Sequence, residues 1–270
     1  MNIWKKLIWE WSNKEKYKIL AIIPARAGSK NIPLKNIQTV NKKPLIAYTI
    51  ESALDSNKIN KIIVSTDSPK IASISKKYGA ETPFLRPKKY ATSKSTTSSV
   101  IFHTLNYLSK NQNYIPDIIT LLQPTNPFRT SADIDKSIKL LQKSTATSVL
   151  GVGKIKKHPY RTFWLNNKFL KPFNSDFKKF FQRQLLPPLH SPTGSIYTFW
   201  YKTFKKYGNY YGPKIKPLIL DNEIDIDDWE DLFFSEMKLK YWNSFKLNRI
   251  DWHEKHYRLC LPVKWWLWCI

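Results

Sequence analysis

The sequence contains few cysteines and few glycines for its length. Its 270 residues include two cysteines, Cys260 and Cys269, both near the C-terminus. At most one disulfide can form, which excludes a disulfide-rich extracellular scaffold and favours a reducing compartment, the cytoplasm, as the expected location. The seven glycines do not form the Gly-x-Gly-x-x-Gly fingerprint of dinucleotide-binding proteins.

Acidic residues are also scarce. Twenty Asp and Glu stand against 45 Lys and Arg, which gives a formal net charge of +25. Such an excess implies anionic partners, but charge alone does not choose among a nucleotide, a nucleic acid and a membrane surface. With 42% hydrophobic residues, the chain can bury the core of one ordinary domain.

Long apolar runs are absent as well, so neither a signal peptide nor a membrane-spanning helix is expected. Residues 1–17 form an N-terminal extension in which tryptophans alternate with charged residues. Residues 241–270 form a basic, Trp-rich C-terminal extension. We expect this C-terminal segment to pack on the domain or on a partner subunit. Contact with a membrane surface is the alternative, because Trp beside Lys suits a water–lipid interface.

Between the extensions, residues 18–240 alternate between short apolar runs and segments with helical spacing. This order predicts a mostly parallel α/β sheet with right-handed crossovers. Ligands bind at the carboxyl ends of such strands, so the residues after Ile23, Val64 and Leu122 are expected to line the site. The predicted strands are 19–23, 62–64, 118–122 and 148–152, and the predicted helices are 45–54, 69–78, 98–110 and 132–143.

The loop after the first predicted strand combines small residues with cations. Small residues allow backbone N–H groups to approach an anion, while Arg26, Lys30 and Lys35 can neutralise a triphosphate. The spacing is not that of a Walker motif. The loop is therefore interpreted as a phosphate-binding loop, with an ordinary basic surface loop as the alternative.

Several segments, in order, resemble the acylneuraminate cytidylyltransferases, the CMP-nonulosonic (sialic) acid synthetases. The matching segments are 23–30, 35–36, 65–67, 85–87, 121–129 and 225–227, and the resemblance covers about 18–240. It implies a Rossmann-like nucleotide-diphospho-sugar transferase fold with helices on both faces of the sheet. It also implies transfer of CMP from CTP to the anomeric hydroxyl of an acidic nine-carbon sugar, with release of pyrophosphate.

The resemblance assigns roles to the basic and polar residues of these segments. Arg26 and Lys35 are expected to grip the triphosphate and to act in catalysis together with Asp225 and Asp227. The expected nucleotide-binding residues are Ala25, Arg26, Gly28, Ser29, Lys35, Asn36, Arg86 and Thr97.

Two carboxylates carry the expected metal site. In an extended segment Asp225 and Asp227 point to the same face. Mg²⁺ takes one or two protein carboxylates and keeps several waters, so this pair beside a polyphosphate predicts a Mg²⁺ site. Helix capping is the alternative role for such an acidic cluster, and it is the role expected for Asp228.

The acceptor side departs from the resembled family. The expected sugar-binding residues are Gln123, Arg161, Arg183 and Gly194. Relatives commonly carry Arg where Ser191 stands, Asn where Thr193 stands and Asp where Ser93 stands. Losing the Arg at 191 removes a bidentate partner for a carboxylate, and the nearest cationic replacements are His158 and Arg161.

The resemblance also implies a homodimer, with residues 154–190 as a dimerisation and acceptor-site segment. Two other functions stay open at this point. One is a homologue with impaired catalysis or shifted specificity, caused by Ser191. The other is a basic nucleic-acid-binding protein, which is disfavoured because positive charge is spread along the chain and no nucleic-acid module is recognisable.

Overall fold

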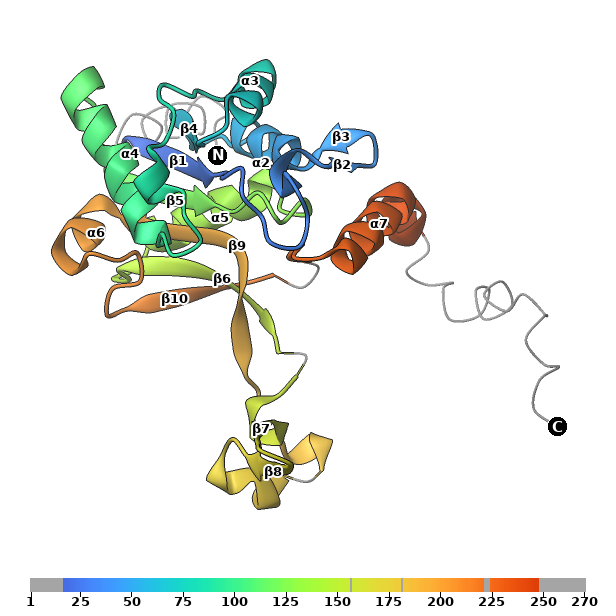
Figure 1. The fold of residues 1–270 in the computed structure, drawn as a ribbon. Helices are drawn as coiled ribbons and strands as arrows, with labels where there is room; N and C mark the ends of the chain where they lie inside the picture. Colours follow the sequence, from blue (N-terminus) through green and yellow to red (C-terminus); the bar gives the residue numbers. More distant parts are fainter. Residues whose placement is uncertain (1–16, 156, 181, 221–223, 248–270) are drawn as a thin grey trace, which may run out of the picture.

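The computed structural model describes residues 17–155, 157–180, 182–220 and 224–247. A six-stranded sheet forms the centre of the molecule, with strand order β10-β6-β9-β5-β1-β4 (Figure 1). β1 pairs in parallel with β4 and β5, and β6 pairs in parallel with β10. β9 is antiparallel to both of its neighbours, β5 and β6. The prediction of a mostly parallel α/β sheet is therefore confirmed.

The predicted elements are all present, with ends that differ by at most two residues. Continuous apolar runs form buried central strands, as expected for strands covered on both faces. The strands are β1 (Ile19–Pro24), β4 (Lys61–Ser65), β5 (Ile118–Leu122) and β6 (Ser148–Lys154), and the helices are α2 (Leu45–Leu54), α3 (Pro69–Lys77), α4 (Thr97–Gln112) and α5 (Ser131–Gln142).

Helices cover both faces of the sheet, as the resemblance implied. On one face, α2, α3 and α5 pack against the sheet through buried residues such as Ile50, Ile71 and Ile138. On the other face, Ile101 and Leu108 of α4 pack with Phe199. α6 (Tyr201–Tyr207) covers that face as well. Two apolar layers therefore hold the strands in place, and the strand ends are left for the site.

Sequence patterns do not predict two strands of the central sheet, β9 and β10, or the short helix α6. β9 (His190–Trp200) begins with polar residues and contains Pro192 and Gly194, so its first half carries no strand-like alternation. β10 (Ile215–Ile219) contains Pro217, which is tolerated because β10 is an edge strand. Two further short strands, β2 (Thr39–Val40) and β3 (Lys43–Pro44), form a small hairpin.

An arm projects from the sheet between β6 and β9 (Figure 1). It contains the antiparallel pair β7 (Phe163–Asn166) and β8 (Phe169–Pro172). Short 3-10 turns complete it: η3 (Pro159–Arg161), η4 (Ser175–Phe180) and η5 (Arg183–Leu185). The arm corresponds to the predicted segment 154–190.

The last described helix, α7 (Trp229–Leu247), crosses the predicted domain boundary at 240. The helix is continuous through residue 240, so the first residues of the expected C-terminal extension are helical. The rest of the C-terminal extension and almost all of the N-terminal one lie outside the described residues. No helix within the described ranges is long and apolar enough to cross a membrane.

Arg129 ties three elements together beneath the strand ends. Its side chain is 4% exposed. One guanidinium nitrogen donates to the carbonyl oxygens of Gln123 (3.1 Å) and Ser195 (2.8 Å), and another donates to the Thr49 hydroxyl. The loop after β5, the middle of β9 and α2 are thereby fixed relative to one another.

Replacing Arg129 by Met is expected to destabilise the fold by about 3 kcal/mol, because buried carbonyls lose their donor at roughly 1–3 kcal/mol each. Urea unfolding measures this change. The control is Arg161→Met on the exposed arm, which should change stability by no more than about 0.5 kcal/mol. Equal effects of the two substitutions would show that Arg129 does not hold these elements together.

Candidate active site

A cavity of about 330 Å³ opens at the carboxyl ends of β1 and β5. Its place confirms the expectation for the residues after Ile23 and Leu122. The residues after Val64 do not line the cavity, but Ser65 and Asp67 accept hydrogen bonds from the loop that does. The lining residues are Pro24, Arg26, Gly28, Ser29, Lys35, Asn36, Gln123, Pro124, Thr125, Gly194, Tyr197, Asp225 and Asp227.

The loop after β1 is held by backbone contacts with the end of β4. Ala25 N donates to Ser65 O (2.9 Å) and Ala27 N donates to Asp67 Oδ1 (2.8 Å). Asn36 Nδ2 donates to Arg26 O (2.9 Å), so this amide shapes the loop. The loop therefore presents Arg26, Gly28 and Ser29 to the cavity without relying on substrate to order it. Ala25 is fully buried and contributes packing and backbone only.

Asp225 and Asp227 lie on the same side of an extended segment, as their spacing predicted. Ile226 between them is fully buried, and its N–H donates to Thr125 O (2.9 Å). With Ile226 anchored in the core, both carboxylates face the cavity. Lys35 Nζ joins them, 3.0 Å from Asp227 Oδ1 and 2.6 Å from Ile226 O.

Asp228 caps α7, which confirms the expected capping role. Its Oδ1 accepts from the N–H of Asp231 (2.9 Å). In return, Asp231 Oδ2 accepts from the N–H groups of Asp227 (2.9 Å) and Asp228 (3.3 Å). This reciprocal arrangement satisfies N–H groups at the start of the helix. Asp225 and Asp227 therefore line the cavity, whereas Asp228 and Asp231 cap the helix.

Burial raises the pKa of the Asp225 carboxyl above its ordinary value. A hydrogen bond with Thr125 opposes this shift, Asp227 adds to it, and Lys35 lowers the pKa. A carboxylate whose charge is disfavoured by burial gains free energy from a nearby cation. Asp225 and Asp227 thus offer hard oxygen ligands where a cation would relieve an electrostatic cost.

Arg86 lies behind the loop and does not line the cavity. It is 5% exposed; one guanidinium nitrogen donates to Ser65 O and another to Tyr90 O (3.3 Å). Burial lowers its pKa to about 10, which nearby Asp67 partly offsets and Arg26 reinforces. Thr97, the first residue of α4, is likewise not among the lining residues. A direct contact of these two with cytidine stays a prediction.

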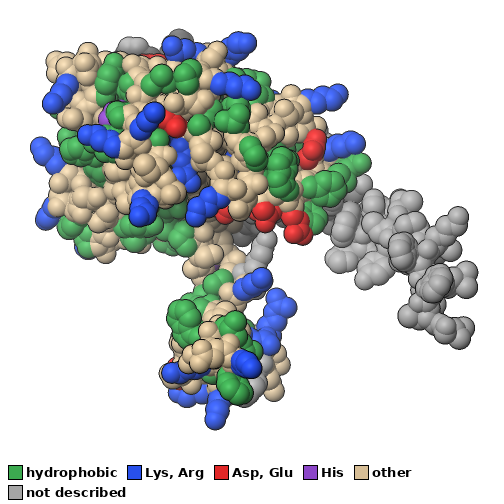
Figure 2. Space-filling view, viewed as in Figure 1, with side chains coloured by type: hydrophobic (Ala, Val, Ile, Leu, Met, Phe, Trp, Pro, Cys, Tyr) green, Lys and Arg blue, Asp and Glu red, His purple; other side chains and the backbone are tan. Residues whose placement is uncertain are grey.

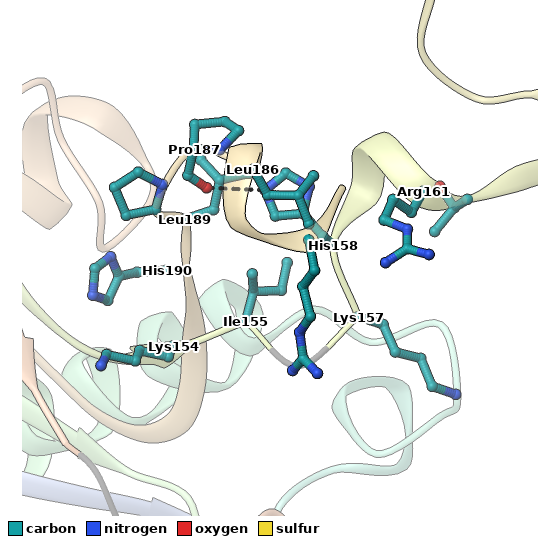
Figure 3. Close-up of a pocket in the computed structure, with 12 residues that line it drawn as sticks. Lys154, Ile155, Lys157, His158, Arg161, Leu186, Pro187, Leu189 and His190 are labelled. Carbon is teal, nitrogen blue, oxygen red and sulfur yellow. Dashed lines mark hydrogen bonds between the residues drawn. The ribbon is translucent and has the colours of Figure 1, made fainter. Parts of the chain in front are cut away.

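The expected sugar-binding residues divide between two cavities. Gln123 and Gly194 line the cavity at the strand ends, whereas Arg161 and Arg183 line a second cavity of about 710 Å³ at the base of the arm (Figure 3). Half of the residues that line this second cavity are basic, and none of the described lining residues is acidic. Its basic residues are Lys154, Lys157, His158, Arg161, Arg183 and His190.

His158 lines the second cavity and makes two contacts within the arm. Its Nδ1 accepts from the Tyr160 N–H (3.3 Å), and its Nε2 lies 3.1 Å from Pro187 O. Through these two contacts the ring connects two segments of the arm. Arg161, which is exposed, is the better of the two candidates that the sequence offered.

Two of the three positions expected to depart from the resembled family, Ser191 and Thr193, lie on β9 beside β6. Ser191 pairs with Gly153, and the next pair along the strands is His190 with Lys154. Thr193 Oγ1 lies 3.3 Å from Gly151 O, so its side chain is directed at β6. Neither Ser191 nor Thr193 is among the residues that line the two cavities.

Gly194 sits in a conformation and a space that exclude a side chain. Its φ is +77°, and a Cβ there would lie 2.7 Å from Asp225 Oδ2. The bare backbone therefore sets how far the Asp225 carboxylate reaches into the cavity.

The sequence places Gly194 on the sugar side and assigns no role to Thr125, Tyr197 or Arg129. The available signal was that Arg129 and Thr125 lie within the matching segment 121–129.

Among α/β folds of this kind, the cavity indicates the nucleotidyltransferases, because cations and a carboxylate pair converge at the strand ends, where a polyphosphate would need them. The comparison with family models agrees: the model described as cytidylyltransferase matches residues 20–256, and the chain belongs to this family.

Three curated relatives share the matched region. The chain is 38% identical, over 78% of its length and 93% of the relative's, to the CMP-N,N'-diacetyllegionaminic acid synthase of Legionella pneumophila. It is 35% identical over 79% of its length to the N-acylneuraminate cytidylyltransferase of Escherichia coli, of which it covers 50%. It is 30% identical over 83% of its length to a pseudaminic acid cytidylyltransferase of Campylobacter jejuni, of which it covers 97%.

Solved structures support the fold. A CMP:2-keto-3-deoxy-manno-octonic acid synthetase complexed with CTP superposes with a TM-score of 0.63 at 15% identity, covering 83% of this chain and 99% of that one. The 4-diphosphocytidyl-2C-methyl-D-erythritol synthase of Anaerococcus prevotii gives 0.57 at 18% identity, covering 83% and 98%. The expected nucleotide-diphospho-sugar transferase type of fold is therefore confirmed.

Gly194→Ala is expected to reduce cytidylyl transfer about 10–100-fold, because the new methyl group displaces the Asp225 carboxylate that this backbone supports. The matched control is Gly208→Ala. Gly208 has a similar φ of +66°, but a Cβ there would have no heavy atom of the described residues within 4 Å. The control should lose about 1–2 kcal/mol of stability for its backbone conformation and keep its turnover. Equal turnover in both variants would reject the positioning role of Gly194.

Proposed function

We propose that this chain transfers CMP from CTP to the anomeric hydroxyl of a nonulosonic acid, with release of pyrophosphate and with dependence on Mg²⁺. The observation that carries the proposal is the meeting of Arg26, Lys35, Asp225 and Asp227 around one cavity at the ends of β1 and β5. The names of the curated relatives support both the nucleotide and the class of acceptor.

The reaction asks for positioning and for charge stabilisation. The sugar oxygen forms a bond to the α-phosphorus of CTP while the bond from that phosphorus to the pyrophosphate oxygen breaks. Negative charge grows on the leaving pyrophosphate, where Arg26 and Lys35 can stabilise it. Gln123, a neutral amide at the end of β5, can hydrogen-bond the sugar.

The residues present fit a magnesium ion. Asp225 and Asp227 provide two carboxylates, and no group of three or more His, Cys, Asp or Glu that could hold a metal is found in the part of the chain that the structure describes. Two protein carboxylates with phosphate and water oxygens are a usual ligand set for Mg²⁺. When bound, the ion would polarise the α-phosphate. Lys35, now paired with Asp227, would then be free to turn to the triphosphate.

An assay across acceptors tests the function. Pyrophosphate release from CTP and formation of the CMP-sugar are measured with sialic, legionaminic and pseudaminic acids, with Mg²⁺ and with a chelator. We expect Mg²⁺-dependent turnover with at least one of these acids and none without an acceptor. CTP binding with no turnover across the panel would instead support an impaired homologue.

Removing the charge of these two acids is expected to abolish activity, whereas removing the charge of Asp225 alone is expected to raise stability. Asp225→Asn with Asp227→Asn should abolish turnover, because the cation ligands are lost. Asp225→Asn alone should raise the melting temperature slightly at pH 7 without ligands, because a neutral amide removes the charge that desolvation and the neighbouring Asp227 carboxylate disfavour.

The pH dependence follows from the raised pKa of Asp225. Its carboxyl holds its proton longer in the folded chain, so native stability falls as pH rises from the unfolded to the folded pKa. The stabilisation by Asn should therefore shrink at acidic pH, where the wild-type carboxyl is neutral too. Thermal melts of the wild type and of Asp225→Asn across pH measure this dependence.

Magnesium-dependent activity near wild type in the variant with both Asp225→Asn and Asp227→Asn would reject the metal assignment.

We further propose that a second copy of the chain completes the acceptor site. Arg161 and Arg183 lie on the arm, away from the cavity at the strand ends. The arm also exposes large apolar side chains, among them Trp164 (58%), Phe169 (81%) and Leu170 (65%). A homodimer in which each arm reaches its partner's cavity would bury these side chains and bring the cations to the sugar carboxylate.

Mixing two inactive variants tests this arrangement. One copy carries Asp225→Asn with Asp227→Asn, and the other carries Arg161→Ala with Arg183→Ala. If arms act across the dimer, a mixed dimer contains one intact site, and activity should reappear after subunit exchange. If each arm serves its own chain, every site keeps a defect and mixing recovers nothing. Light scattering measures the oligomeric state of both variants.

A further inference from the structure

The outward side of α7 carries exposed apolar residues. Four of them recur every four residues, a spacing that places them along one side of a helix: Trp229, Phe233, Met237 and Tyr241. Their side chains are 39% to 57% exposed, and Phe234 beside them is 53% exposed. We call these five residues the outer face of α7.

The domain occupies a different side of the helix. Leu232 and Ser235 are buried, and Leu239 packs against the small core cluster that contains Leu232. Lys238 Nζ lies 4.2 Å from the centre of the Phe128 ring, which attaches the helix to the loop after β5. A helix that is apolar on opposite sides normally meets an apolar environment on both. The outer face therefore calls for a second contact.

The outer face is bordered by acidic residues. Residues 224–236 contain six acidic residues and no basic one, in a chain whose net charge is +25. Glu230 lies three residues before Phe233 and Glu236 three residues after it, so both carboxylates lie beside the apolar side chains. Both glutamates are exposed, and Lys240 adds one exposed cation at the far end of the face. The half of α7 nearest the cavity therefore suits a partner that is apolar and basic.

The arm of this chain has that composition. Its described residues 157–180 and 182–190 contain seven Lys or Arg and a single Asp. The one acid, Asp176, is already paired with Lys179, at 2.9 Å. Figure 2 shows apolar and acidic side chains together over α7, and apolar and basic ones together over the arm. The two surfaces are therefore complementary in charge and alike in their exposed apolar residues.

One face of the β7–β8 hairpin combines aromatic rings with a cation. Trp164 pairs directly with Lys171, and Phe169 lies on the same face, paired with Asn166. Trp164, Phe169 and Lys171 are all exposed, as is Lys168 in the turn between the strands. We call Trp164, Phe169 and Lys171 the hairpin face. A two-stranded hairpin is marginally stable in water unless it packs on another element, so the hairpin face also calls for a partner.

The position of α7 brings these two surfaces into the same region of a dimer. Asp227 lines the cavity at the strand ends, and α7 begins two residues later, at Trp229. An arm from a second copy that delivers Arg161 and Arg183 to this cavity passes the first turns of α7. Within one chain, the arm and α7 leave the sheet in different directions (Figure 1). The arm of the same chain therefore does not cover the outer face.

We propose that the outer face of α7 is the docking surface for the arm of a second copy of this chain. The hairpin face packs on the apolar side chains of α7, and Lys168 and Lys171 face the two glutamates. Burial of the aromatic side chains supplies affinity, while the charges fix the register of the arm. This inference rests on the proposed function, in which arms act across a dimer, and adds the surface that receives the arm.

A charge exchange between the two surfaces tests the proposal. Lys168→Glu with Lys171→Glu should weaken the dimer about tenfold, because like charges then meet across the interface. Glu230→Lys with Glu236→Lys should weaken it about equally, for the same reason. All four changes in one chain restore opposite charges and should recover most of the affinity. Sedimentation velocity over a range of protein concentrations measures the dimer dissociation constant.

The matched control is Lys136→Glu with Lys139→Glu. These two lysines are exposed on α5, and their reversal changes the net charge as much as the reversal on the arm does. The control should leave the dimer dissociation constant unchanged, and circular dichroism checks the folding of every variant. A control that weakens the dimer as much as the arm variant, or a fourfold variant that recovers no affinity, would overturn the proposal.

A photo-crosslink identifies the occupant of the outer face without changing any charge. Benzoylphenylalanine replaces Phe233 in one copy, which is mixed with an isotope-labelled wild-type copy and irradiated. Mass spectrometry should find a crosslink to a labelled peptide from residues 163–173. The control carries the same probe in place of Phe102, which is 58% exposed on α4, and should not reach the arm. A crosslink to another part of the labelled copy, or no crosslink to it, would overturn the proposal.

The outcomes distinguish this inference from the proposed function. If mixed inactive variants recover activity while the charge exchange and the crosslink both fail, arms act across the dimer but α7 does not receive them. If the chain turns over CTP and acceptor as a monomer, CMP transfer stands, whereas both the action of the arm across a dimer and its docking on α7 are wrong.

Discussion

The Asp225 carboxylate lies against the bare backbone of Gly194, where a Cβ would come within 2.7 Å of Oδ2. This contact joins β9 to the segment before α7, two parts of the chain that must meet for the cavity to exist. Arg129 supports the same place from below, because it donates to Ser195 O and to Gln123 O. The cavity is therefore fixed by backbone positions on three elements, which leaves little freedom for the side chains that face a substrate.

The electrostatic design of this site trades stability for function. Burial raises the pKa of Asp225, so the carboxylate costs free energy unless a cation accompanies it. In the structure, Lys35 pairs with Asp227 and donates to Ile226 O. A metal ion and a triphosphate together would satisfy both the carboxylates and the lysine. Such a site is well matched to a nucleotide complexed with a divalent cation.

Much of the fold could be predicted because local patterns and tertiary structure agree. The strand at 118–122 and the helix at 45–54 have the predicted bounds, since a continuous apolar run and a helical period identify them. β9 escaped prediction because Pro192 and Gly194 interrupt its pattern and its order comes from pairing with β5 and β6. The resemblance over 225–227 and the spacing of the two acids together pointed to Asp225 and Asp227. The separation of Arg161 and Arg183 from the cavity depends instead on the path of the arm, which no local pattern encodes.

A crystal structure of the chain with CTP and Mn²⁺, a magnesium substitute with a strong anomalous signal, tests the account most directly. The account predicts an anomalous peak coordinated by Asp225 and Asp227, a triphosphate beside Lys35 and Arg26, and an ammonium group that has left Asp227. A manganese peak away from the two carboxylates, or a triphosphate bound in the cavity at the base of the arm, would contradict it.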